Sequence, residues 1–259
     1  MFPDGNGLRL PFLHIMEFDE AHFTSSAPLL LRQDEIHLWQ AITTQFEARC
    51  GKLELLLSYE ELCRMKKFHF PKERVRFAAA HGILRMLAGR YLNLSPRLLN
   101  FSSSSLGKPA VAGNTSEPIF FNISHSHDIV VLAFARVAGI GVDVEYIRPI
   151  PDWQQIVDSC FHQKERAVLQ NIPLCDRCKA FYECWTRKEA FIKATGEGLS
   201  RPLHSFFTFR GDEKAGRIYH IGGDGLHTGK WRLAEFIPAP QYAGAVAFEL
   251  LSLPSLKNE

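Results

Sequence analysis

The sequence predicts an α+β fold built from two similar halves, and two observations lead to this prediction. Segments that alternate like strands are interspersed with segments of helical periodicity. In addition, a strand, a short acidic and basic helix and a longer helix follow one another in residues 35–92, and the same order recurs in residues 140–196. This self-similarity indicates two related halves packed face to face, with a boundary near Gly139. Chance recurrence in a mixed fold is the alternative. Because ligands favour such seams, we expect the functional site there.

The first half, residues 1–138, is expected to begin with an extended arm, because its first 33 or so residues mix Pro, Gly and Phe without clear periodicity. The strongest helical signal follows Pro71, which suits a first turn. In chain order, the expected elements are a strand at 35–42, a short helix with a basic end at 58–68, a helix at 71–92, a loop entering a strand at 102–111, and two β segments at 119–135 around a polar Ser-His centre.

The second half, residues 139–259, is expected to open with a strand at 139–147, introduced by two glycines. Helical segments are predicted at 153–170 and 176–196. The remainder alternates in a β manner through HSFFTFRG, RIYHIGG, WRLAEFIP and YAGAVAFEL. The second half is therefore expected to mix helices with a sheet, as the first half does.

Composition excludes several classes of protein. A formal net charge of +2 gives no strong field that would attract nucleic acid or a membrane surface. There is no evident signal peptide, and no stretch approaches the roughly 18 apolar residues of a membrane span. Six scattered cysteines are too few for a small disulfide scaffold, so we expect a cytoplasmic protein with reduced thiols. Cys175 and Cys178 could form half of a zinc site, but no second ligand pair is visible.

Two carboxylates lie two residues apart in the predicted strand GVDVE. Asp143 and Glu145 share one face, and Val142 and Val144 take the other. The neighbouring glycines allow another backbone or a ligand to come close. Paired carboxylates repel unless a cation lies between them or one takes up a proton. Oxygen ligands without nearby His or Cys favour Mg²⁺ or Mn²⁺, together with a phosphorylated substrate. The alternative is the exposed face of an edge strand.

The predicted helix at 176–196 carries an acid and a base one turn apart. Glu189 and Lys193 lie roughly 40° apart, at the margin of a buried apolar face. A solvated pair that stabilises the helix by a few tenths of a kcal/mol is the alternative. A carboxylate at the edge of a core is instead a candidate third metal ligand or general base, and the ammonium could neutralise a phosphate. The stem of Lys188 is expected to pass the aromatic residues toward solvent.

Further candidates for contact with a ligand lie upstream. Arg64 ends one predicted helix, Arg76 begins the next, and Lys108 lies in a loop. Ser124 and His125 occupy a polar break in apolar β sequence. Each also has a structural explanation, namely solvated helix ends for the arginines and a satisfied position for the histidine. No glycine-rich phosphate loop of the Walker or dinucleotide kind is present.

Five short motifs occur in a fixed order: LGKP, FNISHS, GVDVE, FHQKE and WTRKEAFIKATGEGL. Their order and spacing resemble the 4′-phosphopantetheinyl transferases, in particular the larger surfactin-synthetase-activating (Sfp-type) group, whose single chain is a pseudo-dimer with its active site at the seam. The resemblance covers the chain from about residue 35 to about residue 250. It implies transfer of the 4′-phosphopantetheine moiety of coenzyme A to a serine of an apo acyl or peptidyl carrier protein, dependent on Mg²⁺, with release of adenosine 3′,5′-bisphosphate. It also implies a monomer.

The resemblance implies roles for individual residues. Asp143, Glu145 and Glu189 match the metal-binding acids. Glu189 also matches the favoured base for the carrier serine, with Glu145 or a metal-bound water as alternatives. Lys193 matches the lysine that holds the pyrophosphate. Arg64, Lys108 and His125 match groups around the 3′-phosphate and adenine end of coenzyme A. Ser124 lies beside them, and Arg76 matches the family's arginine in the long helix, so both are also candidates for contact with coenzyme A.

Three further residues need comment. Glu165 matches a recurrent acid near the site, without a definite role. Glu61 stands where some relatives carry a basic residue, and Phe77 where they carry a small polar one. Both departures are expected to reduce contacts to the nucleotide. A Mg²⁺-dependent nucleotide phosphoesterase and a non-catalytic module that binds coenzyme A or carrier protein are the alternative functions.

Overall fold

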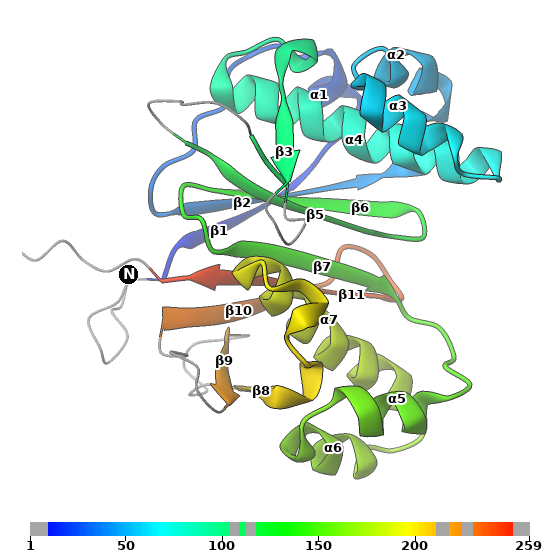
Figure 1. Cartoon of the computed structure of the whole chain (residues 1–259), viewed down its shortest axis with the longest axis vertical. Coiled ribbons are helices and arrows are strands. Elements are labelled where there is room, and N and C mark those ends of the chain that lie inside the picture. The colour runs from blue at the N-terminus through cyan, green and yellow to red at the C-terminus, as the bar shows by residue number, and fades with distance from the viewer. Residues whose placement is uncertain (1–9, 104–108, 112–117, 211–217, 224–229, 251–259) are drawn as a thin grey trace, which may run out of the picture.

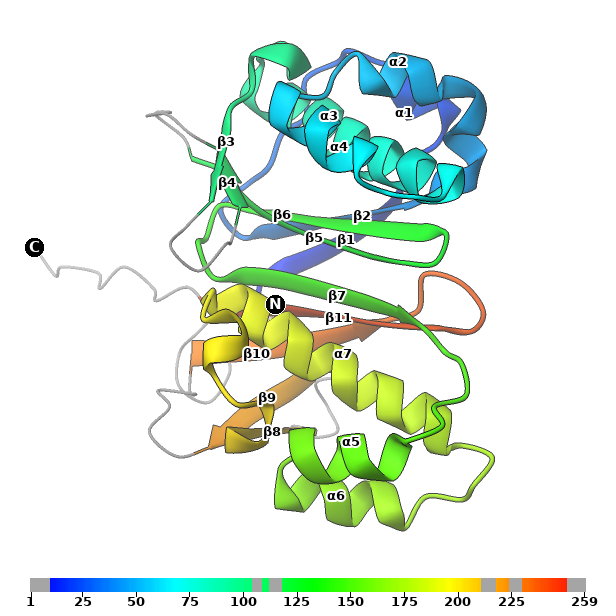
Figure 2. The ribbon, with the colours of Figure 1, turned by 45° about the vertical axis from the view of Figure 1, so that its right-hand side comes forward.

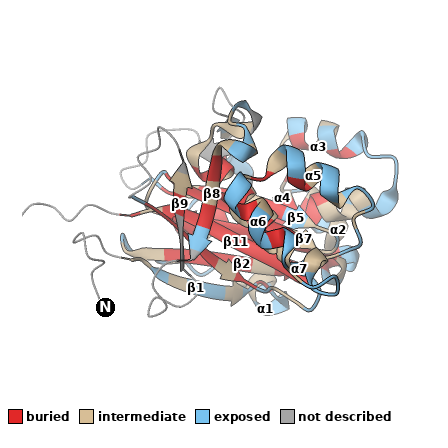
Figure 3. Ribbon diagram, turned by 90° about the horizontal axis from the view of Figure 1, so that it is seen from below, coloured by how far each residue is buried: buried red, intermediate tan, exposed pale blue. Residues whose placement is uncertain are grey.

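The chain folds into four layers, in which two sheets face each other and each is covered on its outer side by helices (Figures 1 and 2). This architecture comes from a computed structural model that describes residues 10–103, 109–111, 118–210, 218–223 and 230–250. Strand segments of both sheets are largely buried, whereas the outer sides of α5 and α6 and much of β1 are exposed (Figure 3). Within the described residues, no helix combines the length and apolar character needed to cross a membrane.

The first half contains a sheet with the strand order β1-β2-β6-β5. Its described elements are β1 (Phe12–Glu17), α1 (Glu20–Thr24), β2 (Glu35–Ile42), η1 (Thr43–Arg49), α2 (Cys50–Glu54), α3 (Tyr59–Lys66), α4 (Pro71–Leu92), η2 (Pro96–Leu98), β3 (Phe101–Ser103), β4 (Pro109–Val111), β5 (Phe120–Ser126) and β6 (Ile129–Ala135). The predictions for β2 and α4 are confirmed to the residue. The expected extended arm is wrong in part, because it contains α1 and pairs as β1 in parallel with β2.

The second half contains a sheet with the strand order β7-β11-β10-β9-β8. Its described elements are β7 (Ile140–Tyr146), α5 (Trp153–Cys160), α6 (Gln163–Gln170), α7 (Arg177–Thr195), η3 (Gly198–Ser200), η4 (Leu203–Ser205), β8 (Phe206–Arg210), β9 (Ile218–Gly223), β10 (Trp231–Phe236) and β11 (Tyr242–Glu249). The predicted helix at 153–170 is two helices, because Phe161 is extended and His162 caps α6.

The two halves repeat one arrangement of elements. In the first half β2, α3, α4, β5 and β6 follow in order, and in the second half β7, α6, α7, β10 and β11 do so. The pairing repeats as well, since β6 lies between β2 and β5, and β11 lies between β7 and β10. The prediction of two similar α+β halves is therefore confirmed.

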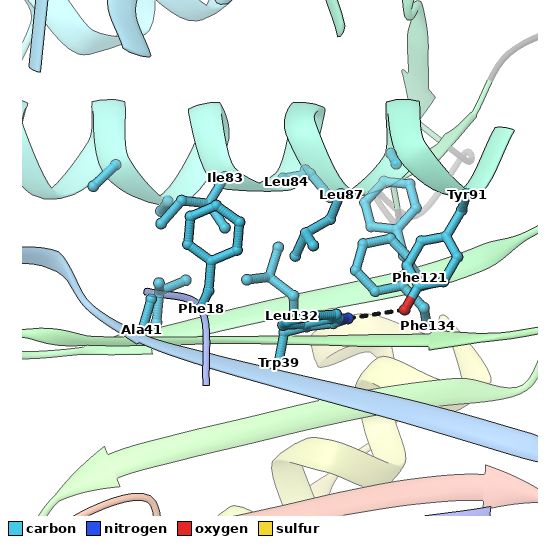
Figure 4. Packing of buried hydrophobic residues seen from close by; sticks show 14 of the residues in the cluster. Phe18, Trp39, Ala41, Ile83, Leu84, Leu87, Tyr91, Phe121, Leu132 and Phe134 are labelled. Atoms are coloured by element: carbon cyan, nitrogen blue, oxygen red, sulfur yellow. Dashed lines mark hydrogen bonds between the residues drawn. The ribbon is translucent and has the colours of Figure 1, made fainter. Parts of the chain in front are cut away.

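Helix α4 anchors the core of the first half. It begins at Pro71 and ends at Asn93, whose left-handed backbone (φ 53°) caps the helix. One side of α4 packs on the first sheet, and Trp39 donates a hydrogen bond from Nε1 to the hydroxyl of Tyr91 at 2.8 Å (Figure 4). This polar contact satisfies both groups inside an otherwise apolar cluster.

The two sheets meet through an apolar layer and through one polar edge. Buried side chains of both sheets, such as Val131 and Val142, form a shared core. Along the edge, Asn122 Oδ1 accepts from the N–H of Val142 at 2.9 Å, and Ser126 Oγ accepts from that of Tyr146 at 3.0 Å. Side chains of β5 therefore satisfy outward N–H groups of β7, which β11 pairs on its other side.

Helix α7 lies directly against β7. A Cβ at Gly141 would lie 2.2 Å from the carbonyl oxygen of Ala190 and 2.3 Å from the nitrogen of Ala194. Only glycine leaves room for this approach. The contact brings the polar flank of α7 over the carboxylate face of β7. The glycines predicted the close approach of a backbone or a ligand, and at Gly141 it is the backbone of α7.

Candidate active site

A pocket of about 430 Å³ opens at the junction of β5, β7 and α7. Its position on the seam agrees with the predicted place of the site. The two predicted motifs, on β7 and α7, supply most of its polar groups. The lining residues are Ile123, Ser124, His125, Asp143, Glu145, Trp185, Glu189 and Lys193.

Lys193 and Ser124 hold one oxygen of Asp143. Lys193 Nζ lies 2.7 Å from Asp143 Oδ1 and also donates to Ser124 Oγ at 3.0 Å. Ser124 Oγ in turn donates to Asp143 Oδ1 at 2.9 Å. The lysine therefore pairs with Asp143 on the neighbouring strand, and no hydrogen bond joins it to Glu189 one turn earlier among the described contacts.

Glu145 and Glu189 occupy a setting that disfavours their charged forms. Burial and the nearby carboxylate of Asp143 raise the pKa of Glu189, against the opposing effect of Lys193. Burial and Asp143 also raise the pKa of Glu145, although Ser126 Oγ donates a hydrogen bond to its Oε2 at 2.8 Å. A cation would relieve both shifts.

The donor set fits a hard divalent ion. Asp143 Oδ2 is buried and has no hydrogen-bond partner among the described residues, so this oxygen is available to a ligand. The three acids offer only oxygen atoms, which suit Mg²⁺. The three acids line one pocket, but their oxygen atoms are too far apart to share one ion as they stand. Among the described residues, they are not a group whose ligand atoms all lie within 4.8 Å of one another. Side-chain movement would be needed for all three to contact one ion.

A larger cavity of about 900 Å³ adjoins this pocket and shares Ile123 and His125 with it. It lies between α3, α4 and β5. Arg64 and Arg76 line it, as do the aromatic rings of Phe68 and Phe77. Cations and flat apolar surfaces together suit a phosphorylated, ring-containing ligand.

The two predicted arginines have different surroundings. Arg76 donates from Nε and Nη2 to Asp128 Oδ1, at 3.1 and 2.8 Å. This pair ties α4 to the β5–β6 turn, so its charge is partly neutralised. Arg64 is exposed and lies over the ring of Phe77, with 5.5 Å between its Cζ and the ring centroid. Its charge faces the cavity.

His125 stands between the two pockets. The residue is exposed, yet its surroundings partly desolvate the ring, and Lys193, His81 and Arg76 add positive charge nearby. Together these effects lower the pKa of His125 despite Asp143, so the imidazole is neutral near pH 7.

Lys188 does not lie where the sequence predicted it, and Lys108 is not among the residues that the structure describes. Lys188 does not reach solvent, because its side chain is 0% exposed and its Nζ lies 2.6 Å from Glu165 Oε2. Glu165 is thus the counterion of a buried lysine, and it also caps α6 by accepting from the N–H of His162. Lys108 lies outside the described residues.

Glu61 and Phe77, the two residues that depart from the family pattern, line the larger cavity. Glu61 is buried and accepts a hydrogen bond from Arg85 Nε at 2.7 Å, while Phe77 stacks on His81 with centroids 4.1 Å apart. Sequence reasoning did not identify His81, and its spacing of four residues from Phe77 was the available signal. Nothing in the sequence indicated that Ser126 or Asp128 would orient site residues.

Comparisons with known proteins agree with this geometry. Residues 139–247 match the family model of the 4′-phosphopantetheinyl transferase superfamily, and residues 37–136 match that of the 4′-phosphopantetheinyl transferase N-terminal domain. The 4′-phosphopantetheinyl transferase HetI of Nostoc sp. is 35% identical over 221 residues, which cover 85% of this chain and 90% of that protein.

Two further relatives extend the comparison. The protein slr0495 of Synechocystis sp. is 32% identical over 181 residues, 70% of this chain and 72% of that protein. The 4′-phosphopantetheinyl transferase Sfp of Bacillus subtilis is 31% identical over 150 residues, 58% of this chain and 65% of its own length. Family motifs, paired domains and near full-length similarity point the same way. The chain belongs to the 4′-phosphopantetheinyl transferase superfamily.

Proposed function

We propose that the protein transfers the 4′-phosphopantetheine moiety of coenzyme A to a serine hydroxyl of an apo acyl or peptidyl carrier protein and releases adenosine 3′,5′-bisphosphate. The observation that carries this proposal is the convergence of Asp143, Glu145, Glu189 and Lys193 on one pocket at the seam. Within the family, we propose membership of the Sfp-type group of single-chain pseudo-dimers. The two repeated halves support this assignment.

Asp143, Glu145 and Glu189 would hold a divalent cation, Mg²⁺ or Mn²⁺. The partnerless Oδ2 of Asp143 and the raised pKa of both glutamates support this. A bound Mg²⁺ would neutralise charge on the pyrophosphate oxygens. Lys193 would then turn from Asp143 to the phosphate, where its ammonium stabilises the charge that develops as the bond breaks.

Glu189 would act as the base. It lies one turn from Lys193 and lines the pocket, which places its carboxylate beside the group that would stabilise the leaving phosphate. The serine proton would move to a Glu189 oxygen as the serine oxygen attacks the β-phosphate. Glu145 is the second candidate, because its pKa is raised as well.

The larger cavity would bind the nucleotide end of coenzyme A. Arg64 offers an exposed charge, and Arg76, Ser124 and His125 lie along the wall that leads to the pocket. Lys108 would complete this set. In this proposal the nucleotide lies over the first half, and the pantetheine arm extends past the seam toward the carrier protein.

The proposal also covers the domain boundary, the oligomeric state and the cellular compartment. The halves would divide at residues 138 and 139, just before β7. The protein would act as a monomer, because both halves that form the seam belong to one chain. It would act in the cytoplasm, where coenzyme A and carrier proteins meet and thiols stay reduced. All six cysteines are free in the structure, which supports such a compartment.

The test is to incubate the protein with coenzyme A and Mg²⁺, with and without apo carrier protein. We expect the carrier to gain the mass of one phosphopantetheine, and the bisphosphate to form only with carrier present. A chelator should stop both. Release of bisphosphate without carrier would indicate a phosphoesterase instead. A panel of acyl and peptidyl carrier proteins in the same assay would identify the substrate class.

A further inference from the structure

A second group of potential metal ligands lies at the edge of the first sheet that is farthest from the active site. His14 belongs to β1, and Glu35 and His37 belong to β2. Strand β5, which lines the active-site pocket, forms the opposite edge of this sheet. One ligand atom from each of the three residues lies within 4.8 Å of the other two. The group is therefore separate from the catalytic pocket.

The strand pairing places these three side chains on one face. Strands β1 and β2 run parallel, and His14 is the register partner of His37. Glu35 and His37 lie two residues apart on β2 and so point to the same side. The juxtaposition is fixed by the backbone ladder rather than by flexible loops, and Figure 1 shows the two strands side by side.

The spacing is close to that of a tetrahedral site. His37 Nε2 lies 3.4 Å from Glu35 Oε2, and His14 Nε2 lies 3.7 Å from Glu35 Oε1. With metal–ligand bonds of about 2.0–2.1 Å, two ligands of a tetrahedral ion are about 3.3–3.4 Å apart. The two histidines contact different oxygens of Glu35, and one ligand atom of each residue lies within 4.8 Å of the others, so side-chain rotation would be needed to close a coordination shell around one ion.

Neighbouring groups already orient two of the three ligands. The Nδ1 atom of His37 is hydrogen-bonded to the hydroxyl of Tyr91 at 2.6 Å, and Trp39 donates to the same hydroxyl (Figure 4). These contacts turn Nε2 of His37 toward Glu35. The N–H of Arg32 donates to Glu35 Oε2 at 3.0 Å. Fixed outer contacts of this kind are typical of metal-binding histidines and carboxylates.

We propose that His14, Glu35 and His37 bind one Zn²⁺ ion. Two imidazole nitrogens and one carboxylate oxygen suit zinc and do not suit Mg²⁺ or Ca²⁺. His14 has 49% of its side chain exposed, so the fourth position faces solvent and can hold a water. The guanidinium of Arg32 lies 3.8 Å from Glu35 Oε1, but 71% of that side chain is exposed and it can swing away.

The ion would fasten β1 to the body of the protein. Strand β1 is an edge strand that pairs only with β2 in the described sheet, and much of it is exposed (Figure 3). A bond from His14 to an ion held by β2 would add a cross-link between the two strands. The role is structural, so it leaves the transfer reaction unchanged.

Zinc binding can be measured on metal-stripped protein by competition with a chromophoric chelator. We expect one site in the wild type, and a loss of affinity greater than about 100-fold in His14→Ala, since removal of a mere outer contact already costs about 10- to 100-fold. Free Zn²⁺ at about 100 times Kd should raise Tm by about 5–10 °C in the wild type. Glu35→Gln should also lose the site.

Two controls address other sources of zinc binding. His204→Ala removes an exposed histidine outside the group and should bind as the wild type does. Cys175→Ser with Cys178→Ser removes the exposed thiol of Cys175 and the half-buried thiol of Cys178, and should also retain the site. Absence of tight binding in the wild type, or binding that survives in His14→Ala and disappears with the cysteines, would overturn the proposal.

Discussion

At the scale of single residues, Lys193 neutralises a buried carboxylate whenever no other cation does so. Its Nζ lies 2.7 Å from Asp143 Oδ1 and is partly exposed to the pocket. A cation held by Asp143 would release this ammonium from the carboxylate and leave it available to a phosphate. In the proposed reaction, the same lysine would stabilise the leaving group.

Replacement of Lys193 tests this role. We expect Lys193→Ala to lower kcat by about 10²- to 10³-fold, as the loss of one charge-stabilising donor does, with a smaller change in KM for coenzyme A. Steady-state kinetics with apo carrier protein measure both parameters. Lys179→Ala, which removes an exposed lysine of the same helix, is the control. A change confined to KM would mean that the lysine only binds substrate.

Glu61 illustrates a residue whose role the sequence did not reveal. Burial alone would raise the pKa of Glu61, but hydrogen bonds from His81, from the N–H of Ser58 and from Arg85 lower it to about 2. The partners lie up to 24 residues away, so no local pattern predicts them. Through these hydrogen bonds, Glu61 holds part of the wall of the larger cavity in place. The sequence had indicated only that a contact to the nucleotide is missing at this position.

The lowered pKa of Glu61 predicts a pH dependence of stability. Because the carboxyl titrates at 4.5 when unfolded and at about 2 when folded, its contribution is present above pH 4.5 and is lost as the pH falls toward 2. Through Glu61, the wild type should lose about 3 kcal/mol of its free energy of unfolding over this pH range, and Glu61→Gln should not show this loss. Urea unfolding between pH 6 and pH 2.5 measures it. Parallel stability curves for the two proteins would contradict the assignment.

At the scale of elements, the position of α7 over β7 builds the site. The sequence predicted the acid pair on one face of the strand and the acid and base on one flank of the helix, because both follow from backbone periodicity. Which strand the helix covers depends on long-range packing, and Gly141 was the only local sign of it. The short elements β1 and α1 were missed, since five or six residues carry too little periodicity.

Gly141→Ala should separate these two elements. Its Cβ would lie within 2.3 Å of the α7 backbone, so we expect a loss of about 3 kcal/mol in the free energy of unfolding and a matching loss of activity. The control is Gly51→Ala in α2, where a Cβ meets nothing within 4 Å and should be neutral or stabilising. Urea denaturation compares them. Equal stability of the two variants would show that α7 can shift freely.

At the scale of the whole molecule, the two halves share one core. Apolar side chains from both sheets pack together, and side chains of β5 satisfy backbone donors of β7. The repeat in the sequence predicted two halves. The hydrogen bonds from β7 to Asn122 and Ser126 across the seam could not be predicted, because both residues look like ordinary strand residues in the sequence. Neither half buries its inner sheet face alone, so we expect them to unfold together.

Hydrogen exchange in rising urea tests this cooperativity. Amides of β6 and β11 should exchange with the same free energy, and Ile140→Ala, which empties a fully buried position in the shared core, should lower both by about 3 kcal/mol. Val168→Ala on exposed α6 should lower neither. If Ile140→Ala affects β11 alone, the halves are independent domains.

The proposed reaction depends on a cation held by three acids at the seam. It is tested most directly by the mass gained by apo carrier protein with coenzyme A and Mg²⁺, measured for Asp143→Ala and Glu189→Ala beside the exposed control Glu47→Ala. We expect no detectable transfer in the two site variants, unchanged circular dichroism in all three, and normal transfer in the control. Near-normal turnover in either site variant would contradict this dependence.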